Sequence, residues 1–124
     1  MGYVGCVSAA CLASNGTKII GVDKNPEKVH QINEGKSPIV EPRLESLIQD
    51  GVKNSDIIAT IDFEKAIKES NACLICVGTP SLKNGHLDMI FIEKVTREIA
   101  TTLQNSKDPF VLIYRSPLEP GTIE

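Results

Sequence analysis

Short apolar runs alternate with segments of helical spacing along the whole chain, and this alternation limits the fold more than any other feature. We interpret four of the apolar runs as strands, at residues 17–23, 57–61, 72–77 and 109–114. Because helical segments separate consecutive runs, neighbouring strands should pair in parallel through right-handed crossovers. The sequence therefore predicts an α/β protein with a doubly wound parallel sheet. The unbroken apolar runs at 72–77 and 109–114 predict strands that are buried on both faces.

The segments between the strands carry helix start and stop signals. Gly16 ends a helix of small residues that should pack closely on the sheet, and Asn25 with Pro26 starts a second helix that Gly35 ends. Apolar residues at three- and four-residue spacing indicate the remaining helices. The predicted helices cover residues 3–15, 26–34, 42–50, 63–69 and 88–104.

The composition is that of one globular domain. Of the 124 residues, 41% are hydrophobic and 23% charged, and the net charge is −3. This balance provides no basic field for nucleic acid or for an anionic membrane. No apolar run approaches the ~20 residues of a spanning helix, and no signal-peptide pattern opens the chain. We therefore expect a soluble, cytoplasmic protein that binds neither nucleic acid nor membrane.

Four cysteines are present, and their spacing argues against a metal cage or a disulfide. Cys73 and Cys76 lie three apart on a predicted strand, so their thiols should point to opposite faces. Cys6 and Cys11 lie five apart on a predicted helix, roughly 140° from each other around its axis. We expect all four to be reduced, buried and structural.

The two histidines provide no recognisable catalytic or metal-binding pattern. His30 is predicted on a helix surface and His86 in a loop, each without a partner pattern. No Ser-His-Asp or Cys-His arrangement and no metal-ligand spacing occurs. We therefore assign no catalytic residue and no metal ligand.

A glycine-rich bend opens the chain and leads directly into the first helix. Gly2 would let the backbone approach a pyrophosphate, Gly5 would let the helix pack closely, and the amides at the helix start would hold the phosphate charge. Asp23 ends the next strand about 20 positions after Gly2, the spacing of a dinucleotide-binding fingerprint. Its carboxylate could accept hydrogen bonds from both ribose hydroxyls and would repel a 2′-phosphate. NAD is therefore favoured over NADP.

The fingerprint is incomplete, because its first glycine and the strand before it are missing. The alternative is a glycine pair that serves only helix packing, but the spacing to Asp23 and the alternating elements favour a dinucleotide site. In the usual Rossmann-like strand order the missing strand is central, between 17–23 and 72–77. We therefore expect a sheet without its first, central strand and a slot of ~9–10 Å there. The free chain should be marginally stable or misfolded.

Further candidates lie at the carboxyl ends of the strands, where open α/β sheets bind ligands. Thr79 and Ser116 could offer hydroxyls or amides to the nicotinamide half of the cofactor, or could serve ordinary turn chemistry. Lys28 lies one helical turn beyond Asp23 and could reach the adenosine edge, or be a solvated surface lysine. Glu41 is predicted as an acid at a helix start, favourable to the helix dipole.

Several motifs resemble the UDP-glucose/GDP-mannose dehydrogenase family, and together they cover essentially the whole chain in order. They are Gly-Tyr-Val-Gly-Cys-Val-Ser-Ala-Ala-Cys-Leu-Ala at 2–13, Gly-Val-Asp-x-Asn at 21–25, Ile-Asn-Glu-Gly-Lys-Ser-Pro-Ile-Val-Glu-Pro at 32–42, Cys-Val-Gly-Thr-Pro at 76–80 and Lys-Asn-Gly-x-Leu-Asp at 83–88. Position by position, the resemblance implies NAD contacts at Tyr3, Val4, Asp23, Lys28 and Thr79.

The resemblance also implies an activity. Members of the family oxidise the C6 hydroxymethyl of a nucleotide-linked sugar to a carboxylate, through an aldehyde and a cysteine thioester, with two NAD. The motifs at 32–42 and 83–88 are similar to members that act on GDP-mannose, which would give GDP-mannuronate, the alginate precursor. UDP-glucose is the alternative substrate. A homo-oligomer is implied for the full-length enzyme.

The sequence departs from the family pattern in ways that limit these expectations. Arg43 stands where the family usually has glycine, which is harmless only if its φ is negative. Pro117 replaces a threonine that would contact NAD. The central helix and the sugar-nucleotide domain are absent, so residues 1–124 are expected to be a partial NAD-binding domain without catalytic groups. A non-catalytic NAD-binding module and a non-functional remnant remain alternatives.

Overall fold

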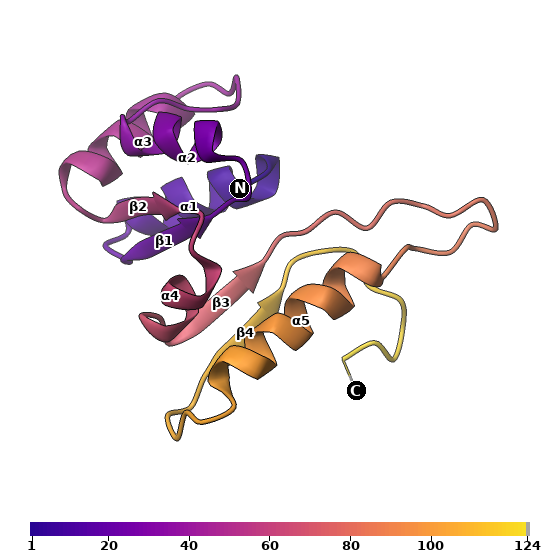
Figure 1. Ribbon diagram of the computed structural model, residues 1–124. Coiled ribbons are helices and arrows are strands. Elements are labelled where there is room, and N and C mark those ends of the chain that lie inside the picture. Colours follow the sequence, from indigo (N-terminus) through magenta and orange to yellow (C-terminus); the bar gives the residue numbers. More distant parts are fainter. Residues whose placement is uncertain (124) are drawn as a thin grey trace. The chain divides into compact units, whose positions relative to one another are not determined.

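The computed structural model describes residues 1–123 and divides into two compact units, which are described separately (Figure 1). Unit 1 is Met1–Ala66, and unit 2 begins at Ile67. Helices and strands alternate as the sequence predicts. In chain order the elements are α1 (Tyr3–Ser14), β1 (Ile19–Val22), α2 (Pro26–Asn33), α3 (Leu44–Lys53), β2 (Ile57–Thr60), α4 (Phe63–Lys68), β3 (Ala72–Ile75), α5 (Ile90–Leu103) and β4 (Val111–Tyr114).

The strands form two parallel pairs, β1 with β2 and β3 with β4. Ile19 pairs with Ile57 in the first, and Ala72 pairs with Val111 in the second. Parallel pairing confirms the predicted α/β class. The strands are shorter than the apolar runs. Residues 76–77, for example, continue the run at 72–75 but lie beyond β3.

The core of unit 1 lies under the face of the sheet that carries Ile57 and Ala59. Small residues of α1 let that helix approach the strands closely. In α3, a Cβ at Gly51 would lie 2.5 Å from Cδ1 of Ile57, so only glycine allows this helix to sit so near β2. The buried helical residues that complete the core are Cys6, Ala10, Ala13, Ile32, Leu44 and Ile48.

Three helices of unit 1 end in the same hydrogen-bonded motif. Beyond α1 and α2, Gly16 (φ 85°) and Gly35 (φ 75°) adopt the left-handed conformation predicted from the sequence. In the α2 motif the Lys36 amide donates to the Gln31 carbonyl, and the Gly35 amide to that of Ile32. No helix in the described part of the chain is long and apolar enough to cross a membrane.

Helix α3 differs from its prediction at both ends. It runs to Lys53 rather than residue 50, and Ser55 takes the left-handed position with φ 59°. It begins after Arg43, which has φ 66°. From the sequence, arginine is expected to be harmless at this position only with a negative φ, and the φ is positive. A non-glycine residue in this conformation costs roughly 1–2 kcal/mol.

The outer edge of β2 is closed by a side chain. Nδ2 of Asn33, the last residue of α2, donates to the Ala59 carbonyl at 2.9 Å, and its Oδ1 accepts from the Ala59 amide at 2.8 Å. The amide group thus bonds to β2 as the backbone of a neighbouring strand would. This satisfies backbone groups that an edge strand otherwise leaves open.

In unit 2, α5 lies along one face of the β3–β4 pair (Figure 1). Ile92 and Ile99 of the helix are buried, and the Thr96 and Tyr114 hydroxyls lie 2.9 Å apart. On the opposite face Val111 and Ile113 are 56% and 48% exposed. The prediction that this strand is buried on both faces is therefore wrong for the described chain, because an apolar run does not show which of its faces is covered.

Candidate functional site

The start of α1 is an uncapped helix N-terminus. Gly2 is the N-cap, with φ −79° and ψ −167°; no side chain caps the helix and no acid lies in its first turn. In α2, by contrast, the Asn25 side chain accepts from the Glu27 amide at 2.9 Å. The α1 amides are therefore open to an external anion, and the helix dipole favours one.

The fold does not require glycine at position 2. Its φ is negative, and a Cβ built on it would meet no heavy atom within 4 Å. Gly5 lies in the first turn of α1, as predicted. The open space around Gly2 agrees with a role in which a ligand approaches the backbone closely.

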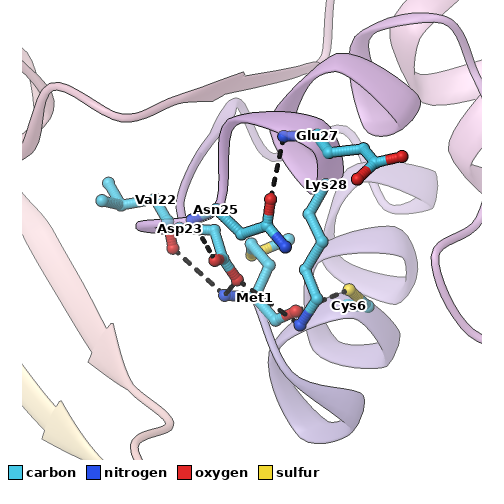
Figure 2. A network of polar contacts seen from close by, with 7 residues as sticks. All are labelled: Met1, Cys6, Val22, Asp23, Asn25, Glu27 and Lys28. Atoms are coloured by element: carbon cyan, nitrogen blue, oxygen red, sulfur yellow. Dashed lines mark hydrogen bonds and ion pairs between the residues drawn. The ribbon is translucent and has the colours of Figure 1, made fainter.

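Asp23 directly follows β1, and its carboxylate lies against Met1, the residue before Gly2 (Figure 2). Oδ2 accepts from the Met1 ammonium at 2.6 Å, and Oδ1 from the Asn25 amide at 2.9 Å. The Met1 ammonium also donates to the Val22 carbonyl at 3.1 Å. Nζ of Lys28 lies 4.0 Å from Oδ2 of Asp23. The fold thus brings together the bend, the acid and the lysine that the sequence singled out.

The surroundings of Asp23 favour its charged form. Partial burial raises the pKa of the carboxyl, but hydrogen bonds from the Met1 ammonium and the Asn25 amide, with the nearby positive charges, outweigh that effect. The pKa of Asp23 therefore lies below its ordinary value. An ionised carboxylate only accepts hydrogen bonds, which suits it to the hydroxyls of a sugar.

Tyr3 and Val4 occupy the first turn of α1, and both side chains are exposed. The Tyr3 hydroxyl donates to Oε1 of Glu41 at 2.7 Å, and this bond to an anion raises the pKa of the phenol. Glu41 was predicted to serve the helix that follows it. That prediction is wrong, because α3 begins at Leu44 and its first-turn acid is Glu45.

The two hydroxyl candidates of unit 2 differ in their hydrogen bonding. The Oγ1 atom of Thr79 is buried and has no partner among the described residues. The Ser116 hydroxyl donates to the Val77 carbonyl at 2.6 Å and so ties the segment after β4 to the segment after β3. An unpartnered buried hydroxyl is costly unless a ligand bonds to it, so Thr79 has bonding capacity to offer.

The loop after β3 contains a short hairpin that sequence reasoning missed. Ser81 and Leu87 form an antiparallel bridge, and Gly85 turns with φ 86°. The Leu87 amide and Nδ1 of His86 both lie 3.1 Å from Oε1 of Glu119. These bonds lower the pKa of Glu119. The Asn84-Gly85 dipeptide was the available signal for this turn.

Both histidines have acidic partners at the surface, which were not identified from the sequence. Nε2 of His30 lies 3.2 Å from Oε1 of Glu34, and His86 contacts Glu119. Both side chains are exposed, as predicted. The four-residue spacing of His30 and Glu34 on a helix could have revealed the first pair.

The four cysteines are free thiols, but only Cys6 is fully buried. The prediction that all four are buried is wrong for Cys11, which is exposed because it lies on the other side of α1 from Cys6; Cys73 and Cys76 are half-buried. Burial raises the pKa of Cys6 and of Cys73. Among residues 1–123, no group of three His, Cys, Asp or Glu side chains is placed to hold a metal ion.

Comparison with known proteins finds one family domain that matches the whole chain. The model of the UDP-glucose/GDP-mannose dehydrogenase family, NAD binding domain, matches residues 1–124. A GDP-mannose 6-dehydrogenase of Pseudomonas putida is 48% identical over 100% of this chain, which is 28% of that enzyme. A UDP-glucose 6-dehydrogenase of Rhizobium meliloti is 36% identical over 98% of this chain and 27% of that enzyme.

Solved structures agree with the sequence matches. A ternary complex of GDP-mannose dehydrogenase from Pseudomonas aeruginosa superposes with a TM-score of 0.94 at 48% identity, covering 98% of this chain and 28% of that one. A UDP-glucose dehydrogenase from Pyrobaculum islandicum gives 0.91 at 29% identity, with the same coverage. The chain therefore spans less than a third of the length of these relatives.

Proposed function

The chain belongs to the UDP-glucose/GDP-mannose dehydrogenase family, and we propose that it supplies the NAD-binding part of a nucleotide-sugar 6-dehydrogenase. The observation that carries this proposal is the Asp23 carboxylate, which bonds to Met1, the residue directly before the uncapped N-cap Gly2 of α1 (Figure 2). An anion site and a ribose acceptor thus stand side by side, as a dinucleotide requires.

Each candidate residue has a role in this proposal. The pyrophosphate lies against the residues of the α1 start, which are Gly2, Tyr3, Val4 and Gly5. Asp23 accepts from the adenosine ribose, because each carboxylate oxygen has a lone pair left for a second hydrogen bond. Lys28 lies at the adenosine edge, and Thr79 and Ser116 serve the nicotinamide half. NAD supplies the hydride acceptor, and we assign no catalytic group to this chain.

GDP-mannose is the substrate we propose for the full-length enzyme, with GDP-mannuronate as its product. Support comes from the 48% identity to a GDP-mannose enzyme, against 36% to a UDP-glucose enzyme. That second match makes UDP-glucose the alternative. Homo-oligomeric assembly and a cytoplasmic location remain predictions from the sequence.

Calorimetric titration of the purified protein with NAD and NADP tests the cofactor assignment. We expect saturable NAD binding that is tighter than NADP binding. Asp23→Asn should weaken NAD binding about 10- to 100-fold, the worth of hydrogen bonds to a charged group. Gly2→Ala should also weaken it, although the fold has room for the methyl group.

Asp56→Asn is the matched control. Asp56 also lies beside a strand of unit 1, but it pairs with Lys18, 2.7 Å away at the surface. Its replacement should leave NAD affinity unchanged. Equal affinity for the two cofactors, or no saturable binding of either, would overturn the role of Asp23.

A further inference from the structure

The Tyr3–Glu41 hydrogen bond joins the start of α1 to a loop 38 residues away in sequence. Tyr3 is the first residue of α1 and directly follows the uncapped N-cap Gly2. Its side chain is 54% exposed, and the bond to Glu41 is the contact that fixes the far end of the ring. Without that bond, a phenol so exposed would be free to change rotamer.

The loop that presents Glu41 is anchored two residues before it, although Val40 in between is exposed. The Ser37 hydroxyl donates to the Ile39 carbonyl at 2.6 Å and accepts from the Ile39 amide at 3.2 Å. Ile39 packs against the core of unit 1. Pro38 and Pro42 each have a fixed φ. Glu41 therefore stands on an anchored loop, which makes it a fixed point for Tyr3.

We propose that Glu41 is a positioning residue for the cofactor, acting through Tyr3. It holds the phenol in one rotamer, so that the ring borders the phosphate site and leaves the helix amides uncovered. This inference rests on the proposed function, because it concerns the same site. The ordering of one side chain is worth about 0.5–1.5 kcal/mol to a binding reaction, which corresponds to an affinity change of about two- to tenfold.

The charge of Glu41 and its hydrogen bond predict opposite effects, so variants can separate them. A carboxylate near the phosphates repels them, and its simple loss would tighten NAD binding. A lost hydrogen bond would instead free Tyr3 and weaken binding. Glu41→Gln keeps an acceptor for the phenol without the charge, whereas Glu41→Ala removes both.

The experiment measures the Kd for NAD by calorimetry in five forms of the protein. These are the wild type, Glu41→Ala, Glu41→Gln, Tyr3→Phe and the double variant Glu41→Ala/Tyr3→Phe. We expect two- to tenfold weaker binding by Glu41→Ala and Tyr3→Phe, and binding by Glu41→Gln within about twofold of the wild type. The double variant should bind no more weakly than the singles, because both remove the same bond.

Two further measurements separate positioning from general loosening of the fold. Glu41→Ala should lower the pKa of Tyr3 in an ultraviolet titration, since the anion beside the phenol raises it. The signal that disappears in Tyr3→Phe identifies this phenol. Glu45→Ala, which removes an acid on the first turn of α3, is the control and should change neither readout.

The outcomes distinguish this inference from the function on which it rests. If the wild type binds NAD and Glu41→Ala binds it equally well, the positioning role is overturned and the cofactor site stands. Additive losses in the double variant, or equal losses in Glu41→Ala and Glu41→Gln, also overturn it. If the wild type binds no NAD, the proposed function and this inference both fail.

Discussion

Units 1 and 2 each contain a parallel pair of four-residue strands, but the pairs are covered differently. In unit 1, α1, α2 and α3 share one core with β2, and Asn33 closes the outer edge of that strand. In unit 2, α5 covers one face of its pair and the other exposes Val111 and Ile113. Ile58, on the other face of the unit 1 pair, is 58% exposed as well. The two units therefore differ in how many helices cover one face of the pair, and in the closed edge of β2.

This difference predicts that the two strand pairs are not equally stable, although both have the same pairing. Two short strands are marginal in water until a helix or a further strand covers them. The buried apolar area therefore sets how firmly each pair is held. We expect unit 1 to be the more resistant to local unfolding, and the predictions below test that ranking in order of decreasing effect.

Truncation of an isoleucine should show the largest difference in unfolding free energy between the two units. Ile32 in unit 1 is 1% exposed, whereas Ile113 in unit 2 is 48% exposed. Ile32→Ala should cost about 2–5 kcal/mol of unfolding free energy, and Ile113→Ala less than about 1 kcal/mol. Urea denaturation followed by circular dichroism measures both. Equal losses would mean that the face of β4 is covered in solution and would remove the contrast.

The closed edge of β2 should contribute the next largest effect. Asn33→Ala deletes two hydrogen bonds to Ala59 and should cost about 1–3 kcal/mol. Asn15→Ala is a control of the same residue type, because its exposed side chain makes one bond, to the Cys11 carbonyl. Asn15→Ala should lower the unfolding free energy by less than Asn33→Ala. A stability of Asn33→Ala equal to that of Asn15→Ala would show that the edge is not held by this amide.

Strained positions make unit 1 less stable than its core allows. Arg43→Gly and Ser55→Gly should each stabilise the protein by about 0.5–1 kcal/mol, since both residues have positive φ. Gly35→Ala is the reverse experiment at an equivalent helix end and should destabilise. Thermal unfolding midpoints report all three changes. A lower midpoint for both glycine variants would contradict the assigned strain.

Acidification should have the smallest effect on stability, and it should act on a carboxylate in each unit. The folded pKa values of Asp23 and Glu119 lie below their ordinary values. Their stabilisation is therefore present above the unfolded pKa and is lost as the pH falls through the folded one, from about pH 5 downward. Asp23→Asn and Glu119→Gln should each flatten this part of the stability–pH curve. An unchanged slope in either variant would show that this carboxylate does not contribute to the pH dependence of stability.

Local signals predicted most of the fold and the first half of the site. The Asn25-Pro26 start, the Gly16 and Gly35 stops and the parallel pairing all follow from short-range chemistry. The spacing of Asp23 from the glycine bend likewise predicted that they would meet. These features depend on backbone conformation and element order, which the sequence states directly.

Features that depend on tertiary contacts could not be predicted in this way. The Glu41 bond to Tyr3 joins distant segments, and nothing near Glu41 in sequence indicates that partner. The exposure of Val111 depends on which elements cover β4. The left-handed conformation of Arg43 opposes its own backbone preference, so propensity indicates the reverse.

The Asn33 side-chain amide limits where a further strand could be added to the β1–β2 pair. On one flank of the pair, a side chain already occupies the Ala59 backbone groups. The Ile19 and Asp23 amides donate toward β2, so the alternate residues Ile20 and Val22 direct their backbone groups away from it, on the other flank. The Met1 ammonium donates to the Val22 carbonyl there. An additional parallel strand would therefore have to dock beside β1, so the layer has a built-in direction of growth.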